Sequence, residues 1–166
     1  TEHIVPYGLN GELELPQASC RKCERITGRN ESKVLRGALL GCRSVLGLKT
    51  RDPKDRPKIF PVFDTSAKPE RKVMVDAEDY PATLLLAALG PPSLLSGTPE
   101  SGGIKRLWNH VFVAPNWPVL RLKYGLNEFA PASTDGKALC LMLAKIAHAY
   151  TVAHLGINAF NPALID

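Results

Sequence analysis

The first residues of the chain include side chains that could act on a phosphodiester. Glu2 and His3 are adjacent in the segment EHIVP, and Glu24 and Glu31 follow in a basic stretch. Phosphodiester hydrolysis needs a base that activates water and a cation that neutralises the charge on the phosphate and the leaving oxygen. Imidazole can act as the base, and carboxylates are the ligands that hard divalent ions prefer. These residue types therefore indicate metal-assisted hydrolysis, if the fold brings them together.

The secondary structure decides whether the side chains of these four residues can come together. Adjacent residues on a strand point to opposite faces, so Glu2 and His3 diverge unless a bend turns them together. Glu24 and Glu31 are seven residues apart and share a helix face only if the helix continues through Gly28. The alternative interpretation of His3 is an exposed or capping histidine near a chain end.

The pair Cys20 and Cys23 forms a C-x-x-C motif. One such pair supplies half of a tetrahedral zinc site, which needs four ligands. The alternatives are a redox motif or ordinary surface thiols, and redox chemistry is disfavoured because no βαβ pattern precedes the pair. Cys42 and Cys140 are predicted to be core thiols.

Positive charge is concentrated in one part of the chain. Twelve basic and four acidic residues lie between Cys20 and Lys58, so this segment carries +8 while the whole chain carries +5. Such a segment favours a polyanionic partner, because phosphate contacts release condensed counterions. The alternative is a solvated helix face followed by a solvated linker. The candidate nucleic-acid-binding residues are Arg21, Lys22, Arg25, Arg29, Lys33 and Arg36.

The first 48 residues are predicted to form two strands and a helix. EHIVP and ELELP flank the turn sequence YGLNG, and the residues from 18 to 46 are predicted to be helical with interruptions near Gly28 and Gly37. The predicted apolar stripe of this helix consists of Ile26, Val34, Leu35, Leu39, Leu40, Val45 and Leu46.

The remaining residues predict a mixed region without a motif that indicates chemistry. We expect a strand and then a short helix in residues 72–89, two strands around a proline turn in residues 104–125, and a long helix in residues 133–156. Ser133 or Thr134 could cap this helix, and Gly156 could end it. Lys145 and His148 would share one of its faces, as a solvated polar stripe or as phosphate contacts. The chain as a whole is predicted to be α+β, with a module at 1–48 and an accessory region at 49–166.

The segments EHIVP, GLNG and LPQASCRKCE together resemble the HNH nuclease motif of the ββα-metal class. The resemblance covers about residues 1–36. It implies that His3 is the general base, that Glu2 and Glu24 ligate Mg²⁺ or a similar divalent ion, and that Gln17 orients the loop. Glu31 is the next candidate for the metal ligand. Gln17 stands where the family often has Asn, and Glu24 stands where Asn or His is usual.

The same resemblance implies a structural zinc ion on Cys20 and Cys23. Related motifs often carry a second C-x-x-C before the Glu-His strand, so the other two ligands are expected upstream of Thr1 in a longer protein. A second C-x-x-C at that place would support the zinc interpretation.

The leading hypothesis is a metal-dependent HNH-type endonuclease that acts on nucleic acid, with DNA as the expected substrate. The alternative is a zinc-stabilised, non-catalytic nucleic-acid-binding module with a degenerate HNH core. A third hypothesis is a protein-interaction domain whose basic segment contacts an acidic partner. No apolar run reaches the length of about 18 residues that a membrane span needs, so we expect a cytoplasmic protein without a membrane partner. The sequence leaves the oligomeric state open.

Overall fold

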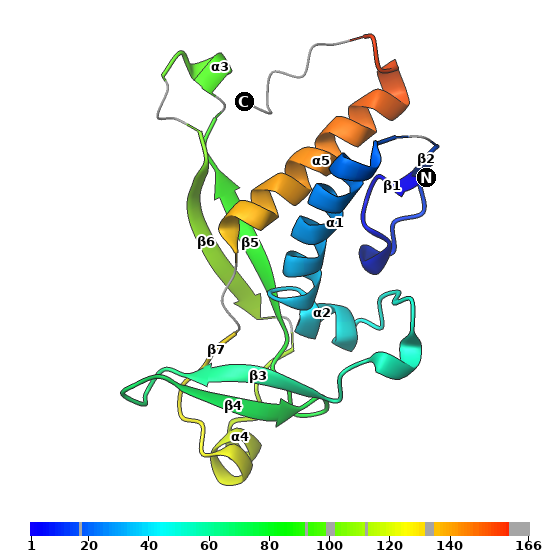
Figure 1. The fold of residues 1–166 in the computed structure, drawn as a ribbon. Coiled ribbons are helices and arrows are strands. Elements are labelled where there is room, and N and C mark those ends of the chain that lie inside the picture. The colour runs from blue at the N-terminus through cyan, green and yellow to red at the C-terminus, as the bar shows by residue number, and fades with distance from the viewer. Residues whose placement is uncertain (17, 92, 99–101, 112, 132–134, 160–166) are drawn as a thin grey trace.

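The structure is a computed structural model that describes residues 1–16, 18–91, 93–98, 102–111, 113–131 and 135–159. It is mixed α+β, with small antiparallel sheets and a long C-terminal helix (Figure 1), as predicted. In chain order the elements are β1 (Glu2–His3), the 3₁₀ helix η1 (Tyr7–Leu9), β2 (Glu14–Leu15), α1 (Arg21–Arg36), α2 (Leu40–Val45), η2 (Pro53–Asp55), β3 (Ile59–Asp64), β4 (Arg71–Asp76), β5 (Thr83–Leu89), α3 (Ser93–Ser96), β6 (Ile104–Val111), α4 (Trp117–Tyr124), β7 (Ala130–Pro131) and α5 (Gly136–Leu155).

The N-terminal hairpin forms where the turn sequence predicts it, although each strand is only two residues long. β1 pairs with β2 in antiparallel register. Asn10 adopts the left-handed conformation with φ 62°, which asparagine tolerates better than most residues. Gly11 is required by a close approach, because a Cβ atom there would lie 1.8 Å from the carbonyl oxygen of Val5. The loop therefore depends on residues without a large side chain.

Helix α1 runs through Gly28 without a break, so the interruption predicted there is wrong. A single glycine costs about 1 kcal/mol in a helix interior, and tertiary packing of the rest of the helix can offset this cost. The second predicted interruption is confirmed, because α1 ends at Arg36 and α2 starts at Leu40.

One apolar core lies between α1 and α5. Its buried residues are Val34, Leu39, Ala138, Leu139 and Met142, and Leu85 and Ala87 of β5 pack against them. The predicted apolar stripe is therefore right at Val34 and Leu39. It is wrong at Ile26, Val45 and Leu46, which are exposed. Ile26 lies outside the face of α1 that carries Val34 and packs on α5, and Val45 and Leu46 lie beyond α1, at the end of α2.

A second core lies around the β4–β3–β7 sheet and α4. Its buried residues are Phe60, Val62, Val75, Tyr80, Ala82, Leu120 and Leu126. In Figure 1 this sheet lies at one end of the molecule, below the crossed helices α1 and α5. The contacts between α1 and α5 join residues on either side of position 48, and the division of the chain there stays a prediction.

Three details of the region after residue 70 differ from the sequence prediction. Residues 83–89 form strand β5 rather than a helix, because they pair along their length with β6. Residues 117–124 form helix α4 rather than a strand, because the Asn116 side chain caps it and proline is tolerated in its first turn. Helix α5 is capped by the side chain of Asp135, while Ser133 and Thr134 lie outside the described residues.

Helix α5 also has the length and mean hydropathy of a membrane-spanning helix. The core helix of a water-soluble protein can meet the same criterion, and α5 uses one face to pack on α1.

Candidate functional site at the N-terminal hairpin

The ammonium group of Lys145 on α5 lies among oxygen atoms from β1 and α1. Its Nζ is 3.4 Å from Glu2 Oε1 and 3.0 Å from Glu31 Oε1. It donates to the carbonyl oxygens of His3 and Ile4 as well. The Lys145 side chain is only 10% exposed, so this cation is withdrawn from water and its charge is met by the two carboxylates. The solvated stripe that the sequence suggests for Lys145 is therefore wrong.

Glu2 is held in its charged form. Burial raises the pKa of Glu2, but hydrogen bonds from Ser19 and Thr27 and the charge of Lys145 together bring this pKa below its ordinary value of 4.5. The Thr27 hydroxyl donates to Glu2 Oε1 at 3.1 Å, which ties the hairpin to α1. Glu2 is thus a fixed anion between the hairpin, α1 and α5.

His3 faces a carboxylate across the hairpin. The register places His3 opposite Glu14, and His3 Nε2 lies 3.3 Å from Glu14 Oε1. His3 Nδ1 is buried and has no hydrogen-bond partner among the described residues. The Glu14 carboxylate therefore lies beside one ring nitrogen of His3, while the other ring nitrogen, Nδ1, has no such neighbour among the described residues.

The structure brings Glu31, rather than Glu24, to Glu2. Glu24 and Glu31 lie on one side of the unbroken helix α1. The Glu24 side chain is nevertheless exposed, and it borders a surface hollow with Arg21 and Arg25. Glu31 Oε1 is buried, and its contact with Lys145 is an ion pair without the alignment of a hydrogen bond. His3 Nδ1 and Glu31 Oε1 are the only buried side-chain polar atoms without a hydrogen-bond partner in the part of the chain that the structure describes.

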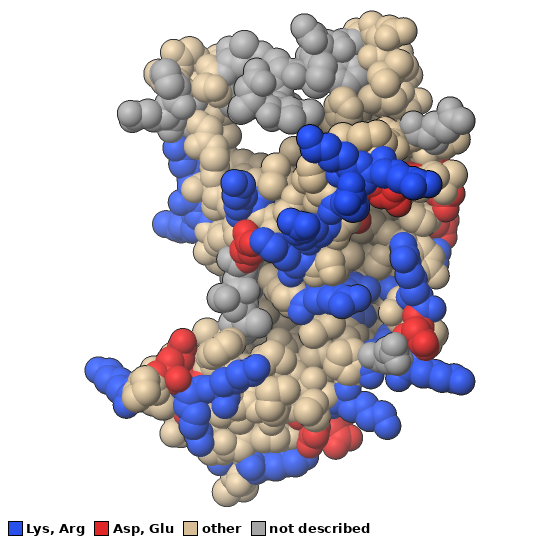
Figure 2. Space-filling model, viewed as in Figure 1, with Lys and Arg blue, Asp and Glu red and all other residues tan. Residues whose placement is uncertain are grey.

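The basic candidates share the other side of α1. At about 100° per residue, the six residues fall within an arc of about 120° over a helix length of about 22 Å. All six side chains are exposed, and Figure 2 shows lysine and arginine side chains gathered over α1 and continuing toward the 49–58 connector. Lys33 also pairs with Asp135 at 3.0 Å, so its charge is partly neutralised. The candidates are Arg21, Lys22, Arg25, Arg29, Lys33 and Arg36.

The two cysteines lie at the start of α1, where Cys20 is the N-cap residue and Cys23 stands in the first turn. Both are exposed and neither is in a disulfide. Hydrogen bonds from the backbone and side chain of Cys23 and from the backbone of Lys22 lower the pKa of the Cys20 thiol. The hydrogen bond to Cys20 raises the pKa of Cys23. A stabilised thiolate suits a zinc ligand and a redox cysteine equally. Cys42 is buried, as predicted, and Cys140 is half-buried.

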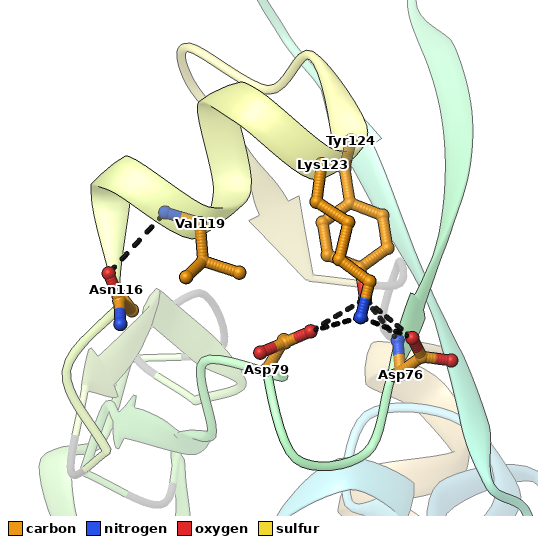
Figure 3. Close-up of polar contacts among 6 residues, drawn as sticks. All are labelled: Asp76, Asp79, Asn116, Val119, Lys123 and Tyr124. Atoms are coloured by element: carbon orange, nitrogen blue, oxygen red, sulfur yellow. Dashed lines mark hydrogen bonds and ion pairs between the residues drawn. The ribbon is translucent and has the colours of Figure 1, made fainter.

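A separate acidic cluster lies beside α4. Oxygen atoms of Asp76, Glu78 and Asp79 lie within 4.8 Å of one another, which would suit a metal ion. Lys123 Nζ already lies 2.8 Å from Asp76 Oδ2 and 2.9 Å from Asp79 Oδ2 (Figure 3). The Tyr124 hydroxyl is 2.8 Å from both of these oxygens. Hydrogen bonds from Lys123 and Tyr124 lower the pKa of both aspartates, so a lysine supplies the positive charge here too.

The sequence analysis did not place Glu14 or Lys145 at this site, although it named Lys145 as a possible phosphate contact. A pairing symmetric about the predicted turn YGLNG would put Leu15 opposite His3, and the observed register is shifted by one residue, which brings Glu14 there instead. Lys145 carried no local signal, because 114 positions separate it from Glu31. Gln17, the predicted loop-orienting residue, lies outside the described residues.

No family model, curated protein or solved structure matches the chain. The functional assignment therefore depends on the residues and their geometry.

We expect Lys145→Met to destabilise the protein by about 2 kcal/mol or more, because it leaves Glu2 and Glu31 as unpaired, largely buried anions. Urea unfolding at pH 7 measures this. The matched control is Lys49→Met, which removes an exposed pair with Glu12 and should cost about 0.5 kcal/mol or less. Equal losses of stability in the two variants would contradict a central role for Lys145.

The lowered pKa of Glu2 predicts a specific pH dependence. Glu2 stabilises the folded state fully above the unfolded pKa of 4.5, and this contribution is lost as the pH falls through the lower folded pKa. Between pH 7 and pH 3, the free energy of unfolding should therefore decrease less in Glu2→Gln than in the wild type. Glu70→Gln, at an exposed position, should follow the wild-type curve. Parallel curves for Glu2→Gln and the wild type would rule out this contribution.

Proposed function

We propose that the chain hydrolyses nucleic-acid phosphodiester bonds with an HNH-type site at the N-terminal hairpin. The observation that carries this proposal is the pair of buried atoms without hydrogen-bond partners, His3 Nδ1 and Glu31 Oε1. Buried polar atoms are nearly always hydrogen-bonded, and exceptions are found where a catalytic role or a bound ion or water explains them. Both exceptions fall on residues that the sequence singles out for phosphodiester chemistry.

In this proposal His3 Nδ1 accepts a proton from the attacking water. Glu14, next to Nε2, then stabilises the imidazolium that forms, as a carboxylate does for the histidine of a catalytic triad. The short strands and the tight loop keep the imidazole and Glu14 opposite each other. Proton transfer of this kind is typically worth about 10²–10⁴-fold in rate.

The oxygen atoms around Lys145 Nζ fit a hard cation. Glu2 and Glu31 contribute carboxylates, and His3 and Ile4 contribute carbonyls. These are the ligand types that Mg²⁺ and similar ions prefer, and the ammonium group marks the place that the chain has arranged for positive charge. Glu2 and Glu31 would hold the ion in place of the Lys145 ammonium, which would have to move aside, and the ion would supply positive charge to the phosphate. Glu24 is the alternative ligand that the resemblance implies.

The basic side of α1 would hold the nucleic acid. Duplex DNA carries about one charge per 1.7 Å of helix axis, so a row of about 22 Å can contact several phosphates. Contacts of this kind position the nucleic acid without reading its bases. We propose DNA as the substrate, and the same row would also hold RNA.

The alternative, a non-catalytic module that only binds nucleic acid (the binding-only hypothesis), has one observation in its favour. The ammonium group of Lys145 already lies between the carboxylates of Glu2 and Glu31. If Lys145 stays there permanently, the site has its cation and needs no metal ion. The chain would then bind nucleic acid through α1 without cleaving it. A cleavage assay separates the two functions, because binding is common to both.

Cleavage of plasmid DNA in the presence of Mg²⁺ or Mn²⁺ should fall by about 10²-fold or more in His3→Ala, which removes the general base. Glu31→Gln should lose activity that a higher metal concentration partly restores. His110→Ala and Glu70→Gln are the matched controls, since both positions are exposed and lie outside the site. A decrease in Glu24→Gln instead of Glu31→Gln would move the metal ligand to Glu24. Absence of metal-dependent cleavage by the wild type would leave the binding-only function.

Binding to a short DNA duplex should weaken steeply with salt. Replacing both Arg25 and Arg29 with Ala should lower the slope of log K against log salt by about 0.9 for each phosphate that the protein no longer neutralises. Fluorescence anisotropy at several NaCl concentrations measures this, and Arg106→Ala on β6 is the control. A flat response of the wild type to salt would favour an acidic protein partner instead.

A further inference from the structure

A hollow lined by arginines lies where α1, α2 and the 47–58 connector meet. It has a volume of about 440 Å³. Arg36 at the end of α1, Arg43 on α2, and Arg51 and Arg56 on the connector contribute guanidinium side chains, and Asp52 contributes a carboxylate. The Asp52 carboxylate accepts the backbone N–H of Lys54 as the cap of η2. Positive charge therefore exceeds negative charge in this hollow.

No ion pair within the described part of the chain neutralises the excess charge of this hollow. None of these four arginines takes part in the ion pairs found between described residues. Arg56 donates to the carbonyl oxygen of Leu48 at 2.7 Å, which orients it without neutralising it. An exposed cluster of this kind could be solvated, but part of this one is withdrawn from water.

Arg43 is the withdrawn member. Its guanidinium donates to the carbonyl oxygens of Gly8, Leu35 and Lys49 at 2.6, 2.9 and 3.1 Å. These bonds fix its position and join the hairpin loop to α1 and the connector. Burial lowers the pKa of Arg43, and the charges of Arg56 and Arg36 lower it further. The like charges of the hollow are thus close enough to repel one another.

We propose that this hollow binds a phosphate group of the nucleic acid that lies along α1. Guanidinium groups are planar donors that match phosphate oxygens, and several of them around one anion remove their mutual repulsion. Arg36 belongs both to the row on α1 and to the hollow, so a strand held on α1 continues into it. This inference rests on the proposed nucleic-acid binding, but not on cleavage.

The phosphate can come from two sources. It is either an internal phosphodiester of the backbone or the phosphomonoester at the end of a strand. The hollow has a volume of about 440 Å³ and is open to solvent on one side. It therefore has room for a phosphate with its attached sugar in either case.

The first arm of the test uses inorganic phosphate alone. Phosphate should raise the Tm of the full chain relative to chloride at equal ionic strength, since a ligand that binds only the folded state stabilises it. Arg51→Ala should reduce this shift, because Arg51 is exposed in the hollow and its replacement breaks no hydrogen bond within the described part of the chain. Arg106→Ala should keep the shift. If phosphate fails to raise the Tm, or if the two variants behave alike, the hollow has no phosphate site.

The second arm compares two duplexes that differ only in a 5′-phosphate. Arg51→Ala should weaken binding about tenfold in fluorescence anisotropy, as expected when one charge-assisted hydrogen bond to phosphate is removed. Arg106→Ala should leave the affinity nearly unchanged. A larger decrease with the 5′-phosphorylated duplex identifies a terminal phosphate, and equal decreases with both duplexes identify an internal one.

The two arms also separate this inference from the proposed function. Normal DNA binding by the wild type with equal affinities of Arg51→Ala and Arg106→Ala would overturn the phosphate site and leave the function standing. A phosphate-dependent Tm shift that Arg51→Ala reduces, without any DNA binding, would support the site and overturn nucleic-acid binding.

Discussion

The ion pairs of Lys145 join the three segments that make up the candidate site. One ammonium group joins Glu2 of the hairpin, Glu31 of α1 and the carbonyl oxygens of His3 and Ile4, although Lys145 itself lies on the last helix. A buried charge is costly unless its partners are in place. The hairpin, α1 and α5 must therefore be assembled together, and the candidate site exists only in the assembled fold.

Lysine and carboxylate side chains meet in the same manner at a second place. Lys123 neutralises Asp76 and Asp79, and Lys145 neutralises Glu2 and Glu31. The clusters differ in burial, since the Lys123 side chain is 47% exposed and that of Lys145 is 10% exposed. Water screens the charges of the Lys123 cluster, so this cluster acts as a surface contact between α4 and the end of β4 with the turn that follows. Water is largely excluded from the Lys145 cluster, so the electrostatic interactions of its charges are stronger than at the surface.

The basic surface differs from these clusters in having few partners. Lys33 on α1 pairs with Asp135, while Arg43 on α2 uses its donors on carbonyl oxygens that carry no net charge. An anion from outside the chain would meet arginines that form no ion pair with any described residue, from Arg21 on α1 to the hollow beside α2. The unpaired acceptors lie instead on the side of α1 that faces the hairpin and α5. Helix α1 therefore separates a surface suited to phosphate from an interior suited to a cation and a base.

The local sequence determined the hairpin turn, the break at Gly37, the long last helix and the basic face of α1, because each depends on residues close together in the chain. Residues 83–89 form a strand because they pair with β6, and this pairing outweighs their local propensity. Helix α1 continues through Gly28 because the helix as a whole packs against α5. The residue types of the candidate site could be predicted, but the choice of Glu31 over Glu24 at Lys145 could not. Glu24 and Glu31 share one side of α1, so the choice depends on where along α1 the Lys145 side chain lies. That position is set by the packing of α5 on α1, which joins residues far apart in the sequence and which no short motif records.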